Sequence, residues 1–259
     1  MEDQMQTSRF ERKLIITEKT AAVVREYIRG YMVLDEFSEG KHDLNYPVHS
    51  IYLDSDHLAT YWATVQTEKT RFKLRVRYYD ENPESPVFFE IKRRVGECIL
   101  KQRGAVHRWA TPSLISGQFP EPSCMISKNP KHFVAVQSFC RLMTDLRASP
   151  KMHIAYEREA WLNPGNNSLR ITFDKYIRGE QRLETKFVTS MADPVSPFLG
   201  RWVLELKYTN RFPNWLGDVI RHLNLTQTGA SKYCGSISSV AGFSQQIVNR
   251  AQSDILNFF

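Results

Sequence analysis

The sequence predicts an α+β protein: an antiparallel, eight-stranded β-barrel with flanking helices. Two patterns predict this class. Apolar and polar residues alternate in roughly eight segments, which is the period of a strand with one polar face, and short turn-forming segments join most of them as hairpins. Between these groups, apolar residues recur at helical spacing. Eight antiparallel strands suit a closed barrel whose interior holds side chains or one slender ligand.

The N-terminal part is predicted to begin with a strand over residues 9–16 and a helix capped by Thr17. The apolar face of that helix consists of Val24, Tyr27, Ile28 and Tyr31. A second strand over 48–53 and a short helix within 54–64 follow. Residues 71–78 then alternate a cation with an apolar residue at every step, so that as a strand they place four positive charges on one face.

The middle of the chain is predicted to continue as a meander. A turn-rich segment, 80–86, precedes an alternating strand over 87–94, and a tight connection leads to a strand over 98–103. Several prolines mark residues 111–131 as a loop with a short helix. Residues 132–148 have the spacing of a helix that packs on the sheet.

The C-terminal part is predicted to contain the remaining strands. Residues 153–162 and 169–178 flank Asn-Pro-Gly-Asn-Asn, a hairpin signal. Alternation predicts further strands over 182–187 and 202–208, and Asn214 is expected to cap a helix that contains Leu216, Val219, Ile220 and Leu223. Helical spacing returns at Val240, Phe243, Ile247 and Ala251 within the tail, 237–259.

Length, charge and cysteine content restrict the function classes. With 259 residues and neither repeat nor linker, the chain is expected to form a single domain over 1–259. A net charge of +7 favours anionic partners. The four cysteines lack zinc-site or redox spacing. The N-terminus is polar and no segment is apolar for long enough to cross a bilayer, which predicts a cytoplasmic protein that a membrane partner could still recruit.

Positive charge is concentrated on the alternating strand positions. Fifteen cations face five carboxylates there, whereas the whole chain has 35 against 28, and an ordinary solvated face would mix the signs more evenly. The cations are Arg9, Lys13, Arg71, Lys73, Arg75, Arg77, Lys92, Arg94, Lys101, Arg103, Arg158, Arg170, Arg182, Lys186 and Lys207. The carboxylates are Glu11, Glu90, Asp174, Glu184 and Glu205.

Plainer interpretations exist for these residues. Glu11 with Lys13, and Glu90 with Lys92, could be surface ion pairs, and Lys232 lies in a polar stretch. Glu205 stands between two leucines and needs a partner, for which Lys207 is available. The sequence has neither a phosphate-binding Gly-x-x-x-x-Gly-Lys loop nor a His-Glu-x-x-His zinc motif.

If the barrel closes around these cations, burying them without an anion would be too costly. A linear phosphate chain meets that need, because arginine binds phosphate oxygens in pairs and lysine supplies a point charge. The few glutamates can hold a divalent metal that bridges those oxygens. Such a site stabilises phosphoryl transfer by charge and needs no protein nucleophile.

The sequence resembles the VTC domain, the polyphosphate polymerase branch of the triphosphate tunnel metalloenzymes, which is related to the CYTH phosphatases. The resemblance spans nearly the whole chain. It rests on the segments Arg-Phe-Glu-Arg-Lys at 9–13, Ser-Ile-Tyr-Leu-Asp at 50–54, Lys-Leu-Arg-Val-Arg-Tyr at 73–78, Phe-Glu-Ile-Lys at 89–92, Leu-Glu-Leu-Lys-Tyr at 204–208 and Ser-Lys-Tyr at 231–233.

The resemblance implies a tunnel that binds ATP and inorganic polyphosphate and uses Mn or Mg. The implied phosphate-binding residues are Lys13, Arg75, Arg77, Lys92, Lys101, Arg158, Arg170, Lys207 and Lys232, and the implied metal ligands are Glu205, Glu11 and Glu90. Of these, Lys13, Arg75, Arg77, Glu205 and Lys232 are the predicted catalytic set.

This sequence departs from the fuller pattern of the superfamily at one position near its start. The fuller superfamily pattern has a further glutamate where this sequence has Arg9, and losing that carboxylate favours a polymerase or a phosphate-binding protein over a hydrolase. The sequence therefore predicts an ATP-dependent polyphosphate polymerase. The alternatives are a metal-dependent tri- or polyphosphatase and a non-catalytic sensor of polyphosphate or inositol phosphates. Nucleic acid is disfavoured because Leu74 and Val76 stack poorly on bases.

Overall fold

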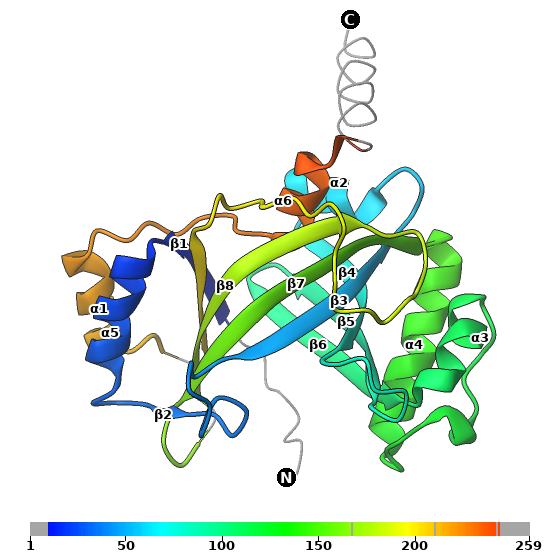
Figure 1. Cartoon of the computed structure of the whole chain (residues 1–259), viewed down its shortest axis with the longest axis horizontal. Coiled ribbons are helices and arrows are strands. Elements are labelled where there is room, and N and C mark those ends of the chain that lie inside the picture. Colours follow the sequence, from blue (N-terminus) through cyan, green and yellow to red (C-terminus); the bar gives the residue numbers. More distant parts are fainter. Residues whose placement is uncertain (1–9, 167, 210, 242, 244–259) are drawn as a thin grey trace, which may run out of the picture.

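The computed structural model describes residues 10–166, 168–209, 211–241 and 243, and its core is one antiparallel sheet (Figure 1). The strands are β1 (Phe10–Ile16), β2 (Val33–Leu34), β3 (Tyr46–Asp54), β4 (Thr70–Tyr78), β5 (Val87–Val95), β6 (Cys98–Val106), β7 (Ser149–Leu162), β8 (Leu169–Gln181) and β9 (Trp202–Tyr208). The helices are α1 (Glu18–Ile28), α2 (Ala59–Val65), α3 (Thr111–Ile115), α4 (Pro130–Leu146), α5 (Asn214–His222) and α6 (Lys232–Ser239), with 3-10 turns η1 (Arg108–Ala110) and η2 (Pro122–Cys124).

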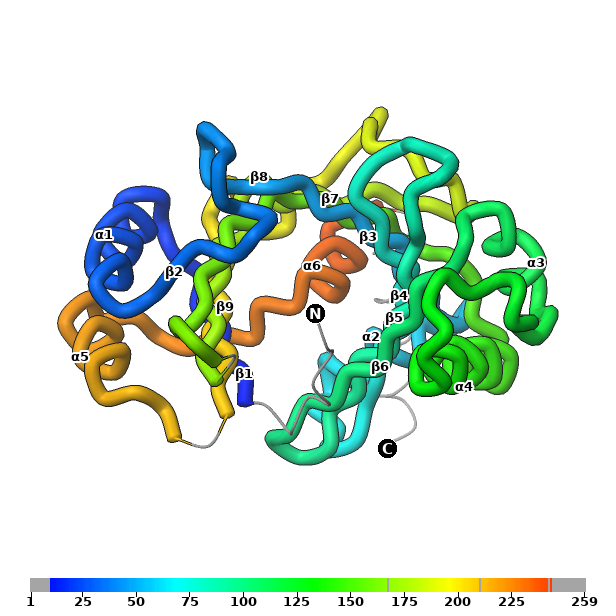
Figure 2. The backbone as a smooth tube through the Cα atoms, turned by 90° about the horizontal axis from the view of Figure 1, so that it is seen from below, coloured from blue at the N-terminus to red at the C-terminus, as the bar shows by residue number. Residues whose placement is uncertain are grey.

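Eight strands follow the order β1-β9-β8-β7-β3-β4-β5-β6, and the short β2 pairs with β7. Figure 2 shows this sheet curving around α6, so that its two edges, β1 and β6, approach each other. No backbone pairing joins these edges in the part of the chain that the structure describes. Instead, the Lys92 ammonium on β5 lies 2.6 Å from a Glu11 carboxylate oxygen on β1. The predicted α+β class is confirmed, but the barrel is an arch rather than a hydrogen-bonded closed sheet.

Helices cover the outer face of the arch because alternate strand residues there are apolar. On one side, α4 packs against β5 and β6, where Phe139 contacts Phe89 edge-to-face with ring centroids 4.8 Å apart. On the other side, α1 and α5 cover β1, β8 and β9 through a second apolar cluster that includes Leu14 and Leu206. The polar set of strand positions is therefore left to the concave face.

Helix α6 lies on the concave side of the sheet (Figure 2). Its N-cap Ser231 accepts a hydrogen bond from the Cys234 amide. Tyr233 stacks on Tyr52 of β3 with centroids 5.1 Å apart and donates to the buried Asp54 carboxylate at 2.7 Å. A side chain at Gly179 of β8 would collide with Ser236 of α6, so glycine permits this close approach. These contacts fix the first turn of α6 against the sheet.

The structure corrects two expectations on the secondary structure and adds a strand. Residues 182–187 are not a strand: β8 ends at Gln181, and Leu183 is 64% exposed, so the segment has no buried face to support pairing. Asn214 begins helix α5 instead of capping it, because Pro213 takes the N-cap position. The short β2 was not predicted.

Among the described residues, α6 overlaps the predicted tail helix, 237–259, only at 237–239, and most of that predicted segment lies outside the described residues. Arg9, Ile247 and Ala251 lie outside the described residues. Strands from residue 10 to residue 208 share one sheet, and the single domain over 1–259 stays a prediction. No helix within the described ranges is both long enough and apolar enough to cross a bilayer.

Candidate functional site

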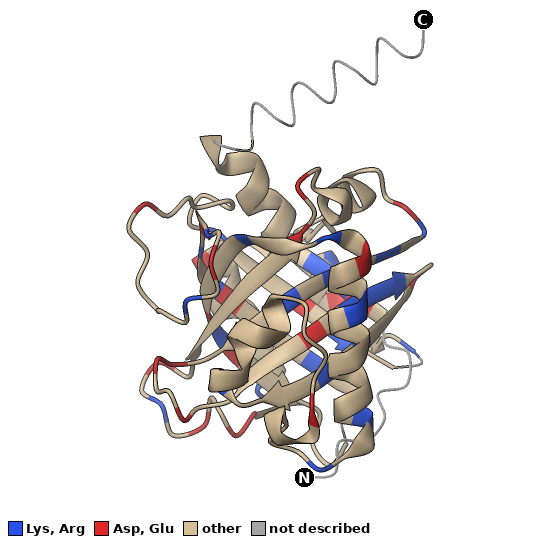
Figure 3. Cartoon of the chain, turned by 90° about the vertical axis from the view of Figure 1, so that its right-hand side faces the viewer, with Lys and Arg blue, Asp and Glu red and all other residues tan. Residues whose placement is uncertain are grey.

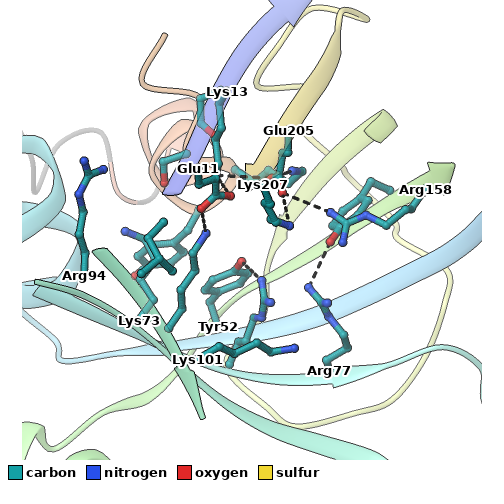
Figure 4. Close-up of a pocket in the computed structure, with 18 of the residues that line it drawn as sticks. Glu11, Lys13, Tyr52, Lys73, Arg77, Arg94, Lys101, Arg158, Glu205 and Lys207 are labelled. Carbon is teal, nitrogen blue, oxygen red and sulfur yellow. Dashed lines mark hydrogen bonds and ion pairs between the residues drawn. The ribbon is translucent and has the colours of Figure 1, made fainter. Parts of the chain in front are cut away.

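The concave face encloses a cavity of about 1270 Å³. Its lining includes residues from both ends of β4, from Arg71 to Arg77, and both ends of β5, from Phe88 to Arg94. Fifteen of the lining residues are Lys or Arg and four are Asp or Glu, so the cavity is strongly cationic. Figure 3 shows Lys, Arg, Asp and Glu on several strands of the sheet, and Figure 4 shows how labelled side chains such as Lys13, Arg77 and Glu205 are arranged around the cavity.

One wall is organised around Glu205, which lies on β9 and is 5% exposed. Its carboxylate lies 2.9 Å from each of the Lys207 and Lys232 ammonium groups. Lys13 of β1 and Arg158 of β7 approach it at 3.5 and 3.7 Å. Burial raises the pKa of Glu205, but these cations outweigh that effect and hold the pKa well below its ordinary value. Glu205 is therefore ionised and holds cations from β1, β7, β9 and α6.

Asp174 extends this group from β8. Arg158 donates to its two oxygens through Nε and Nη2, both at 2.7 Å, in the fork geometry that arginine favours. The Lys232 ammonium lies 2.5 Å from the same carboxylate. We call Glu205, Asp174, Lys13, Arg158, Lys207 and Lys232 the Glu205 cluster. It contains four cations and two carboxylates, which leaves a net positive charge toward the cavity.

The opposite wall is organised around Glu90 of β5, which is fully buried. Arg75 donates to it from Nε at 2.7 Å, and the Lys101 ammonium lies 2.9 Å from its other oxygen. Arg77 and Arg103 are within 3.9 and 3.4 Å. Glu90 with Arg75, Arg77, Lys101 and Arg103 forms the Glu90 cluster. Here one carboxylate serves four cations.

The shortage of negative charge in the Glu90 cluster is visible in its pKa values. Burial raises the pKa of Glu90, but the surrounding cations, Arg77 foremost, hold it well below its usual range. Burial lowers the pKa of Lys101 to about 7, with repulsion from Arg103 and Arg77 adding to the effect, although Glu90 opposes it. Lys101 is thus the cation of this cluster that loses its proton near neutral pH, because one carboxylate must neutralise four cations.

Glu11 and Lys92 lie where the two edges of the sheet meet. Burial raises the pKa of Glu11, but Lys92 and Lys13 lower it to about 2. Burial lowers the pKa of Lys92 to about 8. Glu11 is 3.8 Å from the Lys13 ammonium, which also contacts Glu205. This pair therefore connects the edge of the sheet to the Glu205 cluster.

Three arginines of the cavity have further partners, which are tyrosine hydroxyls for Arg75 and Arg77 and a carboxylate for Arg170. Arg77 donates to the hydroxyl of Tyr156 at 3.1 Å, and Arg75 to that of Tyr52 at 2.9 Å. Arg170 is paired with the buried Asp35 at 2.8 Å. Arg170 therefore has its own counterion, unlike Arg77, whose nearest carboxylate in the described residues is 3.9 Å away.

All nine predicted phosphate-binding residues line this cavity. Of the fifteen strand cations selected by alternation, twelve line it; Arg9 is outside the described residues, and Arg182 and Lys186 pair with Glu180 and Glu184 away from it. The roles assigned to these residues stay predictions. The residues Asp35, Tyr52, Arg103, Tyr156 and Asp174 belong to the same network but were not predicted as site residues.

The three predicted metal ligands differ in their position relative to the cavity: Glu11 and Glu205 line it, and Glu90 does not. Within the described ranges, no three His, Cys, Asp or Glu side chains are grouped to hold a metal ion. Glu90 is fully buried and does not line the cavity, which disfavours a metal there. Glu11 and Glu205 both line the cavity and both contact Lys13. They fit a divalent ion that takes one or two carboxylates and completes its shell with phosphate oxygens and water.

Comparison with solved structures gives distant similarities. A proposed adenylate cyclase of Bacillus halodurans shares 12% identity over 85% of this chain and 91% of its own, with a TM-score of 0.48. A protein of Pyrococcus horikoshii shares 13% over 86% and 94%, with a TM-score of 0.41. The Mimivirus capping enzyme triphosphatase shares 12% over 84% and 87%, with a TM-score of 0.36. Among curated proteins, none matches significantly.

The comparison with protein families is more direct. The VTC domain matches residues 8–241, which includes every strand of the sheet and helix α6. The segments on which the resemblance rests, from β1 through β4, β5 and β9 to α6, contribute side chains to one cavity. The chain belongs to the VTC domain family.

Proposed function

We propose that this protein is an ATP-dependent polyphosphate polymerase. The observation that supports this most is a continuous cationic cavity, lined from both ends of its strands, whose cations outnumber its carboxylates fifteen to four. Excess buried positive charge is costly without an anion. The cavity extends along β4, from Arg71 to Arg77, and along β5, from Phe88 to Arg94. A linear phosphate chain matches both the charge and the shape.

In the proposed reaction, an oxygen of the terminal phosphate of polyphosphate attacks the γ-phosphorus of ATP. The bond from that phosphorus to the β-γ bridging oxygen breaks, its electrons leave with ADP, and the chain grows by one phosphate. Arg75, Arg77 and Arg158 orient the phosphates, while Lys13 and Lys232 neutralise charge on the transferred group. The protein acts by alignment and electrostatic stabilisation rather than by a covalent intermediate.

Glu205, with Glu11 beside it, is the proposed ligand of a bound Mn²⁺ or Mg²⁺, which would neutralise phosphate oxygens during transfer. The ammonium groups around Glu205 keep it ionised, and therefore available to a cation, at neutral pH. Lys207 and Lys232 contact the same carboxylate, so they restrain its position. Positioning of this carboxylate is the contribution we assign to the Glu205 cluster.

The test is to incubate the purified protein with ATP and MnCl₂ and to resolve the products by length, with tripolyphosphate as a second substrate. Long chains together with ADP would support a polymerase. Free phosphate, or cleavage of tripolyphosphate without longer products, would replace the proposal with a phosphatase. Unchanged ATP combined with tight binding of polyphosphate would replace it with a sensor. MgCl₂ in place of MnCl₂ tests the metal preference.

A further inference from the structure

The ends of β4 and β5 next to the 96–97 turn place cations directly opposite one another. In the register of these strands, Arg71 faces Arg94 and Lys73 faces Lys92. Like charges at directly opposed positions destabilise an antiparallel pair. All four side chains line the cavity. Two consecutive cross-strand positions are therefore kept at an electrostatic cost to the free protein.

Lys92 has a counterion, the Glu11 carboxylate 2.6 Å away, but the partners of the other three residues do not remove that cost. Arg71 donates to the Glu68 carbonyl, Arg94 donates to the Gly96 carbonyl at 2.8 Å, and Lys73 donates to the Thr64 hydroxyl. Within the described residues, neither arginine nor Lys73 has an ion pair with a carboxylate. Burial lowers the pKa of Arg71, and the facing Arg94 lowers it further. An anion that lies between the strands would relieve this repulsion.

The opposite end of the cavity has a different composition. There, Phe37, Tyr46, Tyr79 and Phe88 touch in series, with ring centroids 5.7, 6.4 and 5.8 Å apart. The Arg103 guanidinium lies over the Phe88 ring at 3.6 Å from its centroid. We call this end the aromatic mouth, and the end formed by Lys69, Arg71, Lys73 and Arg94 the basic mouth. Aromatic and guanidinium planes suit a nucleobase, whereas a phosphate chain offers nothing to stack.

We propose that the cavity has a direction: the growing polyphosphate passes over the Arg71–Arg94 and Lys73–Lys92 positions and leaves through the basic mouth. This inference rests on the proposed function and adds a subsite to it. Residues two apart on a strand are about 7 Å apart, so an extended chain can contact both cross-strand pairs in sequence. The two pairs lie beyond Arg75 and the Glu90 cluster along β4, where they would bind phosphates that have already been transferred.

The test is a double variant, Arg71→Ala with Arg94→Ala, whose matched control is Lys131→Ala with Arg141→Ala on the exposed surface of α4. Both variants lose two positive charges. We expect the cavity variant to lose at least tenfold in affinity for long polyphosphate, to keep its affinity for tripolyphosphate, and to make shorter products from ATP. By analogy with single-stranded nucleic acid, losing two phosphate contacts should reduce the salt dependence of long-chain binding by about 1.4 in log–log slope.

Failure of the inference and failure of the proposed function give different results. If the unaltered protein binds neither tripolyphosphate nor long polyphosphate, the proposed function is wrong. If the unaltered protein binds both, and the cavity variant binds both as well as the α4 control does, the direction is wrong. Equal losses for the short and long chains would also contradict it. Because the change removes repulsion, the thermal unfolding temperature should not fall, which separates a binding defect from misfolding.

Discussion

The two walls of the cavity solve one problem, burial of many cations, in different ways. Glu90 binds four cations that all come from the β4–β5–β6 meander, and it is fully enclosed. Glu205 binds cations from β1, β7, β9 and α6, and it lines the cavity. Moreover, Asp174 contacts two of the cations of Glu205, namely Arg158 and Lys232. Among the described residues, no second carboxylate contacts the four cations of Glu90.

This difference suggests a structural role for Glu90 and a chemical role for Glu205. An enclosed carboxylate that is the main counterion of its neighbours stabilises the fold, because its loss leaves charges buried without a partner. Glu205 lies at the cavity surface, and three of its four cations also contact a second carboxylate, so it is free to act on a ligand. We therefore expect Glu90 to matter most for stability and Glu205 to matter most for turnover.

The largest effect is expected from Glu90→Gln. The change leaves Arg75 and Arg77 buried without their carboxylate, and removing one partner of a buried ion pair typically costs about 3–5 kcal/mol. Urea unfolding should show this loss, and tripolyphosphate should restore part of it by replacing the missing charge. Glu184→Gln, which breaks an exposed pair with Lys186, is the control. If the two variants were equally stable, Glu90 would not be needed to stabilise the fold.

Glu205→Gln should lower turnover by at least about 100-fold, the scale of losing one preorganised electrostatic group in an active site. Asp174 still neutralises Arg158 and Lys232 in this variant, so unfolding should change less than in Glu90→Gln. Binding of tripolyphosphate should be largely kept. The measurements are turnover with ATP and MnCl₂, and tripolyphosphate affinity by calorimetry. Full turnover in the variant would exclude Glu205 as a metal ligand.

Alternation alone predicted much of this arrangement. Arg75, Arg77 and Lys92 face the cavity because residues two apart share a face of a regular strand. The same pattern also placed Arg182 and Lys186 there, which was wrong. In the middle of β7 the pairing with β8 shifts register after Ala155, and β8 ends at Gln181. Periodicity cannot detect either event, since each depends on a partner strand.

The rest of the site depended on contacts between distant residues. Alternation placed Asp174 on the charged face, four positions after Arg170 on β8, but its pairing with Arg158 requires the β7–β8 register. Lys232 appears in the sequence as part of a polar stretch. It becomes buried because Tyr233 binds Asp54, and Gly179 admits the helix. These are tertiary contacts, with no local signal in the chain.

The two clusters should also differ in their response to pH. The Glu90 cluster contains Lys101, whose pKa burial lowers to about 7. Burial also lowers the pKa of Lys232, but the carboxylates Asp174 and Glu205 outweigh that effect and raise it above its ordinary value. Because the folded protein holds Lys101 less protonated than the unfolded chain does, stability of the free protein should rise as pH increases from about 7 toward the ordinary lysine value. Anion affinity should change in the opposite direction.

The corresponding measurement is tripolyphosphate affinity across this range for the unaltered protein and for Lys101→Arg. Binding favours protonated Lys101, so affinity should weaken several-fold as the pH rises through about 7, and again through about 8 where Lys92 loses its proton. Arginine stays charged, so the variant should lose the first of these steps. A profile identical to that of the unaltered protein would show that Lys101 does not bind phosphate.

The smallest effect should come from the cap of α6. Ser231→Ala removes an N-cap, which costs about 1 kcal/mol, and Thr17→Ala removes the equivalent cap from α1 on the outer face. Both should lower stability alike. Only Ser231→Ala should raise KM for ATP, because the first turn of α6 places Lys232 against Glu205. If the two variants were kinetically alike, the position of α6 would not limit the Glu205 cluster, and the contrast between the two walls would rest on the carboxylates alone.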